Sequence, residues 1–341
     1  MIRLYQIVLL LGLTLVLQSC FKEDEPLDPY KSPPGVFTGM AETKKDYSMQ
    51  TYYDLETNQF VASNHRSDWD IMLSAAEGSF AIYLNSAKKM RAYNTQSTDL
   101  NVVVNLTDTA VVKWKYDEST GSADSTAIGK WGQPSGNTVV SDQYVYIIDR
   151  GFTPDGIQIG YQKLRINSFG NNKYSITIAN VDGSNAKELE LVKNSGYNFL
   201  FVSFNEGGKQ VIIEPPKDSY DLLFTQYTTR VYYENFPKFE WYSVNGTLLN
   251  PSGEVEMARD TVTAFENIDA NATLGYTYSK LWDAMGYNWK SYNIDLGVYT
   301  ILTYRVFIIR NRKGNYYKMR FVGFTNNQGD RGYPTFEVSK I

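Results

Sequence analysis

A two-residue alternation of large apolar and other side chains constrains the fold of this chain more than any other feature. Trp69, Ile71 and Leu73 alternate with Asp70 and Met72, and the same pattern recurs around 80–85, 163–167 and 318–322. Successive side chains of a strand point to opposite faces, so this period is typical of half-buried β-strands. Turn signals such as Gly170-Asn171-Asn172, Gly207-Gly208 and Lys313-Gly314-Asn315 separate the runs.

The aromatic composition supports the same interpretation, because Tyr, Phe and Trp suit pleated, half-buried surfaces. The chain has 27 Tyr, 17 Phe and 6 Trp. We therefore predict a mostly β protein with antiparallel, sandwich-like modules and few helices. Only residues 184–191 and 264–270 are candidates for helices, and neither has a clear amphipathic face.

Several landmarks occur twice along the chain in the same order. The matches pair Trp69-Asp70-Ile71-Met72-Leu73 with Tyr220-Asp221-Leu222-Leu223-Phe224, Leu84-Asn85 and Met90 with Leu249-Asn250 and Met257, Trp131 with Trp289, and Tyr161-Gln162-Lys163-Leu164-Arg165-Ile166 with Tyr316-Tyr317-Lys318-Met319-Arg320-Phe321. Their common order predicts two tandem, related β modules at 36–195 and 196–341. The alternative is chance similarity between short alternating strands.

The first twenty residues, MIRLYQIVLLLGLTLVLQSC, resemble the signal of a bacterial lipoprotein. A basic residue precedes an apolar stretch that is shorter than a membrane span, and the stretch ends at Leu17-Gln18-Ser19-Cys20. The resemblance implies a signal peptide at 1–19 and an acylated Cys20 that anchors the protein in the outer membrane. The alternative is an ordinary secretory signal.

The residues after Cys20 predict a surface tether. The run Lys22-Glu23-Asp24-Glu25 resembles the acidic signal for surface export of lipoproteins in the Bacteroidetes, although it could also be a solvated charge run. Residues 21–35 then contain four prolines, so we predict an irregular tether at 20–35.

The charge and the counts of Cys and His exclude several function classes. There are 33 basic and 37 acidic residues, a net charge of −4, and no basic block, so we predict no nucleic-acid partner. One Cys and one His exclude disulfides, multi-Cys metal sites and two-His metal centres within the chain. The sequence contains no nucleophile elbow, phosphate loop or HExxH motif, so we predict a protein that is not an enzyme.

Phrases spread over the body of the chain resemble the HmuY family. They are Trp69-Asp70-Ile71, Ile82-Tyr83-Leu84-Asn85, YDLLFTQYTT (220–229), VNGTLLNPSG (244–253), MGYNWKSY (285–292) and YYKMRFVGF with GYPTFEV (316–338). The resemblance implies a mostly β surface lipoprotein of the Bacteroidetes, in a family of which some members bind haem and act as haemophore-like scavengers. Haem is ligated by paired His in some members and by Met in others; a single His excludes the first arrangement within one chain.

Three residues are candidate haem ligands. His65 lies in a polar stretch before Trp69, where it is either an axial ligand or a solvated turn residue. Met90 and Met257 occupy matching positions after the Leu-Asn pairs and are either thioether ligands or core residues. Met72 and Met285 carry the same alternatives, and exposure of Met72 would favour ligation.

Two tryptophans near turns, Trp114 and Trp241, are candidate aromatic contacts for a sugar or a porphyrin, or else core residues. We interpret Trp131 and Trp289 as core residues. Asp70 and Asp221 are either a pair of glycosidase carboxylates or, as we favour, structural carboxylates that cap a turn or bond a neighbouring backbone amide. The leading hypothesis is a lipid-anchored surface binding protein for nutrient capture, with haem or another porphyrin as ligand and an outer-membrane receptor as a partner. The alternative is a carbohydrate-binding or adhesive surface lipoprotein with non-catalytic β modules.

Overall fold

Antiparallel strands make up the computed structural model, which describes residues 33–232 and 238–341. The predicted signal peptide, Cys20 and the tether up to residue 32 lie outside the described residues. The prediction of a mostly β fold with few helices is confirmed. The described helices are all 3-10 turns of three or four residues: Ser86–Lys88, Ala123–Ser125, Asn205–Gly207, Lys217–Ser219, Phe265–Asn267 and Ala272–Gly275.

The two candidate helices are wrong in most of their length. Residues 187–192 form strand β12, and of 264–270 only the turn Phe265–Asn267 is helical. In β12 the side chain of Leu191 is buried against the strand's partner β11 while its neighbours are exposed, which is the alternation of an edge strand. Pairing with β11 therefore determines that this segment is a strand, since its local sequence favours neither helix nor strand.

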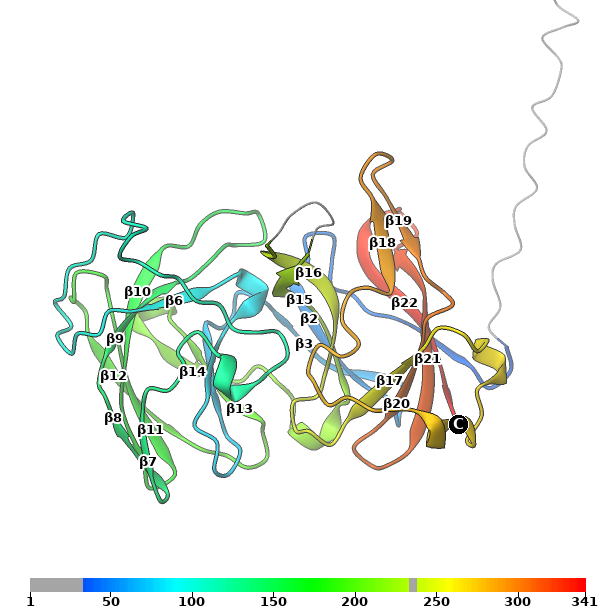
Figure 1. Ribbon diagram of the computed structural model, residues 1–341, viewed down its shortest axis with the longest axis horizontal. Coiled ribbons are helices and arrows are strands. Elements are labelled where there is room, and N and C mark those ends of the chain that lie inside the picture. The colour runs from blue at the N-terminus through cyan, green and yellow to red at the C-terminus, as the bar shows by residue number, and fades with distance from the viewer. Residues whose placement is uncertain (1–32, 233–237) are drawn as a thin grey trace, which may run out of the picture. The chain divides into compact units, whose positions relative to one another are not determined.

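The strands between residues 71 and 211 form two facing sheets, which we call sandwich A (Figure 1, cyan to green). The first sheet has the order β14-β13-β4-β5: Lys209–Val211, Phe199–Ser203, Ile71–Ser74 and Ile82–Leu84. The second contains β6 (Arg91–Asn94), β7 (Gly132–Ser135), β8 (Thr138–Ser141), β9 (Val145–Asp149), β10 (Tyr161–Gly170), β11 (Lys173–Ala179) and β12 (Lys187–Val192). Their inner faces enclose one apolar core that includes Ile71, Leu73, Trp131 and Tyr174.

The remaining strands form a second pair of sheets, sandwich B, together with a short hairpin. One sheet has the order β16-β15-β2-β3: Glu240–Leu249, Leu222–Val231, Met49–Asp54 and Gln59–His65. The other has the order β1-β22-β21-β20-β17: Phe37–Met40, Arg331–Lys340, Tyr316–Thr325, Val306–Arg310 and Glu256–Asp260. The hairpin is β18 (Lys290–Asn293) with β19 (Val298–Ile301). Leu222, Phe224 and Trp289 lie in the core of sandwich B, and the burial of Trp131 and Trp289 confirms their interpretation as core residues.

Strand pairing crosses the predicted module boundary at 195/196 in both directions. β13, from the second predicted module, pairs with β4, in the register Phe201 with Met72. β2, from the first, pairs with β15, in the register Leu222 with Tyr53. Sandwich A is therefore a continuous segment inserted between β3 and β15 of sandwich B. The duplication itself stays a prediction.

Candidate functional site

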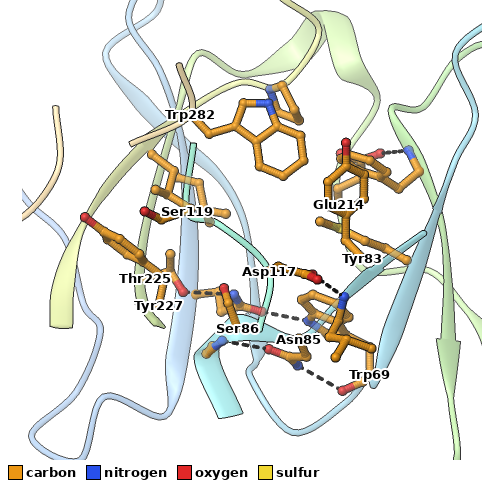
Figure 2. A pocket seen from close by; sticks show the side chains of 18 of the residues that line it. Trp69, Tyr83, Asn85, Ser86, Asp117, Ser119, Glu214, Thr225, Tyr227 and Trp282 are labelled. Carbon is orange, nitrogen blue, oxygen red and sulfur yellow. Dashed lines mark hydrogen bonds between the residues drawn. The ribbon is translucent and has the colours of Figure 1, made fainter. Parts of the chain in front are cut away.

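A pocket lies between the two sandwiches, where the four-stranded sheet of each presents the face that its own core does not use (Figure 2). The pocket has about 770 Å³ of empty volume, part of it open to solvent. Its apolar and aromatic lining comes from both sandwiches: Trp69, Met72, Tyr83, Phe199 and Phe201 from A, and Tyr52, Tyr220, Leu223, Tyr227, Leu248 and Trp282 from B. A concave site whose lining combines aromatic and aliphatic walls with polar side chains is a usual form of a small-molecule site.

The alternation of the strands explains why one sheet serves both a core and the pocket. In β4, Ile71 and Leu73 enter the core of sandwich A, while Met72 between them lines the pocket. In β15, Leu222 enters the core of sandwich B and Leu223 lines the pocket. Each sheet is therefore apolar on both faces, as expected of strands covered on both sides.

The predicted face of Trp69 is wrong. Alternation placed Trp69 with Ile71 and Leu73, but its indole packs with Met72 and Phe201 on the pocket face. Trp69 precedes β4, which begins at Ile71, so the strand period does not apply to it. Asp70, which follows it, is held at the strand entrance by two cations, Lys88 and Arg150.

Hydrogen bonds fix the lower wall of the pocket across the two sandwiches. The amide of Gln50 accepts from Trp69 Nε1 at 2.9 Å and donates to Thr225 Oγ1 at 2.9 Å (Figure 2). The Asn85 amide donates to the carbonyl oxygens of Arg66 and Trp69, which anchors the turn at Ser86. Side chains held in this way form a preorganised wall.

A loop of sandwich A closes the pocket against Trp282. The Trp282 amide donates to the Thr120 carbonyl at 3.1 Å, and the Tyr83 hydroxyl donates to the Gly121 carbonyl at 3.0 Å. Gly121 has a φ of +80°, and a Cβ at this position would lie 2.1 Å from the indole of Trp282. Only glycine therefore lets the loop pass this close to the ring.

Two buried carboxyl groups face the pocket without a cation beside them. Asp117 accepts from the backbone amides of Leu84 and Ala127, each at 2.6 Å, and burial raises its pKa to about 7. Glu214 accepts from the Phe199 amide at 2.7 Å, and burial likewise raises its pKa to about 7. Both carboxyl groups therefore take up a proton readily near neutral pH.

The lining of the pocket contains three acidic side chains, those of Asp117, Glu118 and Glu214, and no Lys, Arg or His. Its polar chemistry consequently suits an uncharged or cationic group better than an anionic one. In the described part of the chain, no three His, Cys, Asp or Glu side chains are grouped so that they could hold a metal ion. The described residues also include no helix long and apolar enough to cross a membrane.

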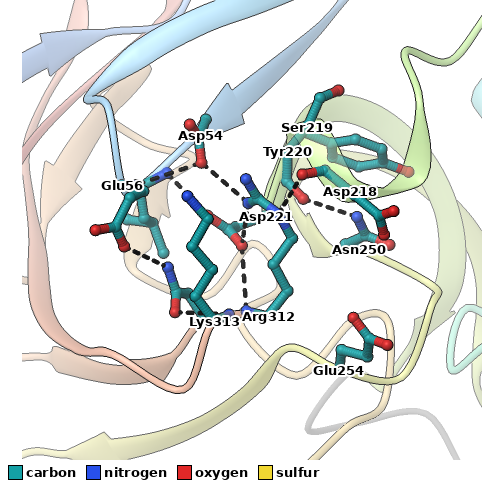
Figure 3. A network of polar contacts seen from close by, with 12 residues as sticks. Asp54, Glu56, Asp218, Ser219, Tyr220, Asp221, Asn250, Glu254, Arg312 and Lys313 are labelled. Carbon is teal, nitrogen blue, oxygen red and sulfur yellow. Dashed lines mark hydrogen bonds and ion pairs between the residues drawn. The ribbon is translucent and has the colours of Figure 1, made fainter.

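A polar network borders the same junction in sandwich B (Figure 3). Arg312 donates to Asp54 at 2.9 Å and to Asp221 at 2.8 Å, and Asp221 accepts the backbone amide of Leu55 at 2.9 Å. In sandwich A, Asp70 accepts the amide of Phe204 at 2.7 Å. Both aspartates bond a neighbouring backbone amide, so the structural interpretation of Asp70 and Asp221 is confirmed.

His65, the predicted imidazole ligand, is the last residue of β3 and is half-buried outside the pocket lining. Its Nδ1 accepts a hydrogen bond from the backbone amide of Ser67 at 3.2 Å. A neutral imidazole that accepts at Nδ1 carries its proton on Nε2, so Nε2 has no lone pair for a metal. His65 can ligate iron only if this turn rearranges.

Met90 and Met257 lie in different cores. Met90 is 1% exposed within the core of sandwich A, and Met257 is 3% exposed within that of sandwich B. Neither thioether lines the pocket, and the two cannot meet at one iron. Met285 is fully buried as well, whereas Met72 is partly buried on the pocket wall.

The two candidate aromatic contacts, Trp114 and Trp241, line one shallow hollow on the surface, together with Tyr116 and Arg230. Tyr116 stacks on Trp241 with ring centroids 5.0 Å apart. The Arg91 guanidinium lies 4.6 Å from the centre of the Trp114 ring. The structure therefore brings together two residues that are far apart in the sequence.

Sequence reasoning missed the pocket and its carboxyl groups. Asp117 and Glu214 lie in segments without a motif, and their burial depends on contacts with distant strands. The one available signal was the apolar character of both faces of the 71–73 and 222–224 strands, which indicates two buried faces.

Among solved structures, this chain is similar to several proteins at low sequence identity. Apo PinO from Porphyromonas gingivitis has 10% identity and a TM-score of 0.32, and the match covers 90% of this chain and 98% of that one. An apo HmuY analog from Tannerella forsythia has 11% identity and a TM-score of 0.24, with 89% and 94% covered. No curated protein matches the chain.

The comparison with protein families identifies the relationship at the level of sequence. The profile described as HmuY protein matches residues 46–338, which takes in both sandwiches and the pocket between them. The resemblance noted in the sequence is therefore confirmed, and this chain belongs to the HmuY family.

Proposed function

We propose that this protein is a lipid-anchored, non-catalytic surface protein that captures a small hydrophobic ligand in the pocket between the sandwiches. The observation that carries the proposal is the pocket itself, whose aromatic walls come from both sandwiches and are held by hydrogen bonds between them. These rings are largely buried, and a planar apolar ligand gains free energy by covering the part of their surface that still faces the pocket. Membership of the HmuY family supports a role in nutrient capture.

Haem or another porphyrin is the ligand that we propose to test first. The aromatic walls suit a porphyrin ring, and Met72 places one thioether on the wall, which is a donor that haem iron accepts. The lining offers no cation for a propionate and no second sulfur or imidazole donor. The residues present therefore fit a porphyrin ring with at most one axial ligand from Met72, and not the His65, Met90 or Met257 ligation proposed from the sequence.

The test is a titration with haemin and with its reduced form, followed by visible spectroscopy. A thioether is a softer ligand than imidazole and favours ferrous iron. We expect the reduced spectrum to show a sharpened Soret band in the wild type and in Met90→Leu, which changes a core thioether, and to lose it in Met72→Leu. A spectrum like that of free haemin at equal protein concentration would rule out haem and leave the pocket to an uncharged aromatic ligand.

A second candidate function, binding of a carbohydrate, is favoured by the shared hollow of Trp114 and Trp241. Exposed rings next to an arginine can stack on sugar faces. Trp241→Ala should then abolish retention on a glycan surface, while Met72→Leu leaves it unchanged. Equal retention of both variants would exclude the hollow as a sugar site.

Anchoring through Cys20 is the proposed localisation, in the outer membrane and facing outward, where a receptor could take up the ligand. Cys20→Ala should release the protein from the membrane fraction or leave it unprocessed. Changing Lys22, Glu23, Asp24 and Glu25 together to Ala should leave acylation intact but reduce cleavage by external protease. Unchanged fractionation of the Cys20 variant would contradict the anchor.

A further inference from the structure

A second hollow, separate from the aromatic pocket, lies where sandwich B meets the turn after Asn85. It has about 650 Å³ of empty volume, part of it open to solvent. Gln226 lines both cavities, and its amide donates to the Ala87 carbonyl at 3.0 Å, so this contact lies between them. The hollow is lined by five cationic side chains: Lys45, Arg66, Lys88, Lys89 and Arg331. Its one acidic lining residue is Asp46.

Two of the five cations have a carboxylate partner. Lys45 pairs with Asp330 at 2.7 Å, and Lys88 pairs with Asp70 at 2.5 Å. Asp70 is shared with a further cation, Arg150, so the buried cluster behind the hollow keeps an excess of positive charge. Arg66 and Lys89 take part in none of the ion pairs found among the described residues.

Arg66 carries the argument, because it is a buried guanidinium that pairs with no carboxylate of the described residues. It is 4% exposed, its Nη1 donates to the Ala87 carbonyl, and its Nε has no hydrogen-bond partner within residues 33–232 and 238–341. Burial lowers the pKa of Arg66, which reports the cost of holding this charge away from water. Asp46 raises that pKa through space but is exposed and accepts the Ser48 amide at 3.0 Å instead.

An unpaired donor on a buried cation is costly unless a partner completes it. The guanidinium group presents its N–H donors in a planar fork that matches two oxygens of a carboxylate or phosphate. Lys89 and Arg331 at the rim would supply further positive charge to the same anion, and Tyr47, over whose ring Arg331 lies at 5.7 Å, forms part of the wall.

We propose that this hollow is a binding site for an oxyanion, with Arg66 as its central donor and Lys89 and Arg331 as charges at its rim. The ligand class is a small molecule or headgroup that presents carboxylate or phosphate oxygens. The site does not depend on the ligand of the aromatic pocket, so it can be tested whether or not that pocket binds haem.

The test measures the melting temperature of the whole mature protein as inorganic phosphate replaces chloride at constant ionic strength. The wild type should show a saturable rise in melting temperature. Lys89→Gln should weaken the apparent affinity about tenfold, the effect of losing one charge-assisted hydrogen bond. Arg66→Gln should abolish the phosphate dependence, whereas Lys130→Gln, which removes an exposed cation elsewhere, should keep the wild-type curve.

Citrate and benzoate, titrated in the same way, distinguish the two sources of oxyanion: saturation by these carboxylates alone assigns a carboxylate ligand, and saturation by phosphate alone assigns a phosphate. If Arg66→Gln does not fold, the comparison of Lys89→Gln with Lys130→Gln tests the site, because only Lys89→Gln should weaken phosphate binding. The proposal is overturned if no oxyanion stabilises the wild type more than chloride. It is also overturned if Lys130→Gln weakens the effect as much as Lys89→Gln, since binding would then be diffuse.

Discussion

Sandwich A and sandwich B place an aspartate at matching positions of the predicted repeat but balance its charge in different ways. Asp70 and Asp221 both stand at the entrance of a strand, and each accepts a backbone amide from a hairpin that comes from elsewhere in the sequence. The asparagines that follow, Asn85 and Asn250, also match, since each donates to two backbone carbonyls near its aspartate. The backbone role is the same in both sandwiches.

The net charge of the buried cluster around each aspartate differs in sign: it is positive around Asp70 and negative around Asp221. Asp70 has two cations, Lys88 and Arg150, whereas Arg312 is one cation shared by two carboxylates, Asp54 and Asp221. Burial opposes ionisation of Asp70, but its cations hold its pKa below the ordinary value. Burial raises the pKa of Asp221 in spite of Arg312. The fold therefore requires the carboxylate oxygens for hairpin bonding, while the surrounding charge is free to vary.

Separating the chain at the predicted module boundary should have the largest effect. Residues 36–195 lack strands β13 and β14 of sandwich A, and 196–341 lack β1 to β3 of sandwich B. We expect neither fragment to unfold cooperatively alone, and the mixture to recover the near-UV circular dichroism of the intact chain. As a matched control, a 67–216 fragment contains every strand of sandwich A and should fold alone. Cooperative unfolding of isolated 36–195 would show that the crossed hairpins are dispensable.

Asp70→Asn should destabilise the protein more than Asp221→Asn. The first change leaves two buried cations without a carboxylate, which costs about 3–5 kcal/mol. The second leaves Arg312 paired with Asp54 and removes a carboxylate that is already hard to ionise, so we expect about 1–2 kcal/mol. Urea unfolding measures both values. Equal losses would mean that hairpin bonding, and not charge, dominates at both sites.

The arginines should show the reverse order. Arg312→Leu leaves Asp54 and Asp221 facing each other without a cation and should cost about 3 kcal/mol. Arg150→Leu leaves the Asp70–Lys88 pair in place and should cost about 1 kcal/mol. The free energy of unfolding in urea, measured beside the aspartate variants, is the readout. A larger loss for Arg150→Leu would contradict the charge difference between the sandwiches.

A pH titration extends the comparison from Asp70 and Asp221, which have cations beside them, to Glu214 in the pocket, beside which the described residues place none. The pKa of Glu214 is raised from an ordinary 4.5 to about 7, so the folded state binds the proton more tightly. Its stabilising effect is complete below pH 4.5 and is lost as pH rises through about 7, by about 3 kcal/mol. Glu214→Gln should remove this part of the slope in urea unfolding between pH 5 and 8. Glu254→Gln, an exposed control, should retain it.

The sequence predicted the strands better than their partners. Alternation in 71–73 and 163–166 correctly indicated strands, because the period depends only on local burial. It contained no information on whether Phe199–Ser203 pairs with β4 or with a strand of its own predicted module, since any apolar strand edge satisfies the same pattern. The pocket lies between the two four-stranded sheets that these crossed pairings complete, so it could not be predicted without them.

The candidate site was predicted only in part. Trp114 and Trp241 were singled out for their chemistry, and the structure places them in one hollow. Arg66 could not be predicted, because an arginine in a polar stretch is ordinarily solvated. Its burial results from the Ala87 turn and the sheet of sandwich B closing over it, contacts that no local pattern encodes.

The pairing of the first strand with the last determines when this protein can finish folding. Phe37 of β1 pairs with Val338 of β22, so about 300 residues must leave the ribosome before that ladder can form, which takes about 15 to 60 seconds at usual synthesis rates. Sandwich A, by contrast, is continuous and can close earlier. β2 and β3 can already pair with each other, and β2 with β15, but β1 has no partner until the C-terminal strand arrives, so a chaperone that binds exposed strands during synthesis would have β1 as its longest-lived substrate.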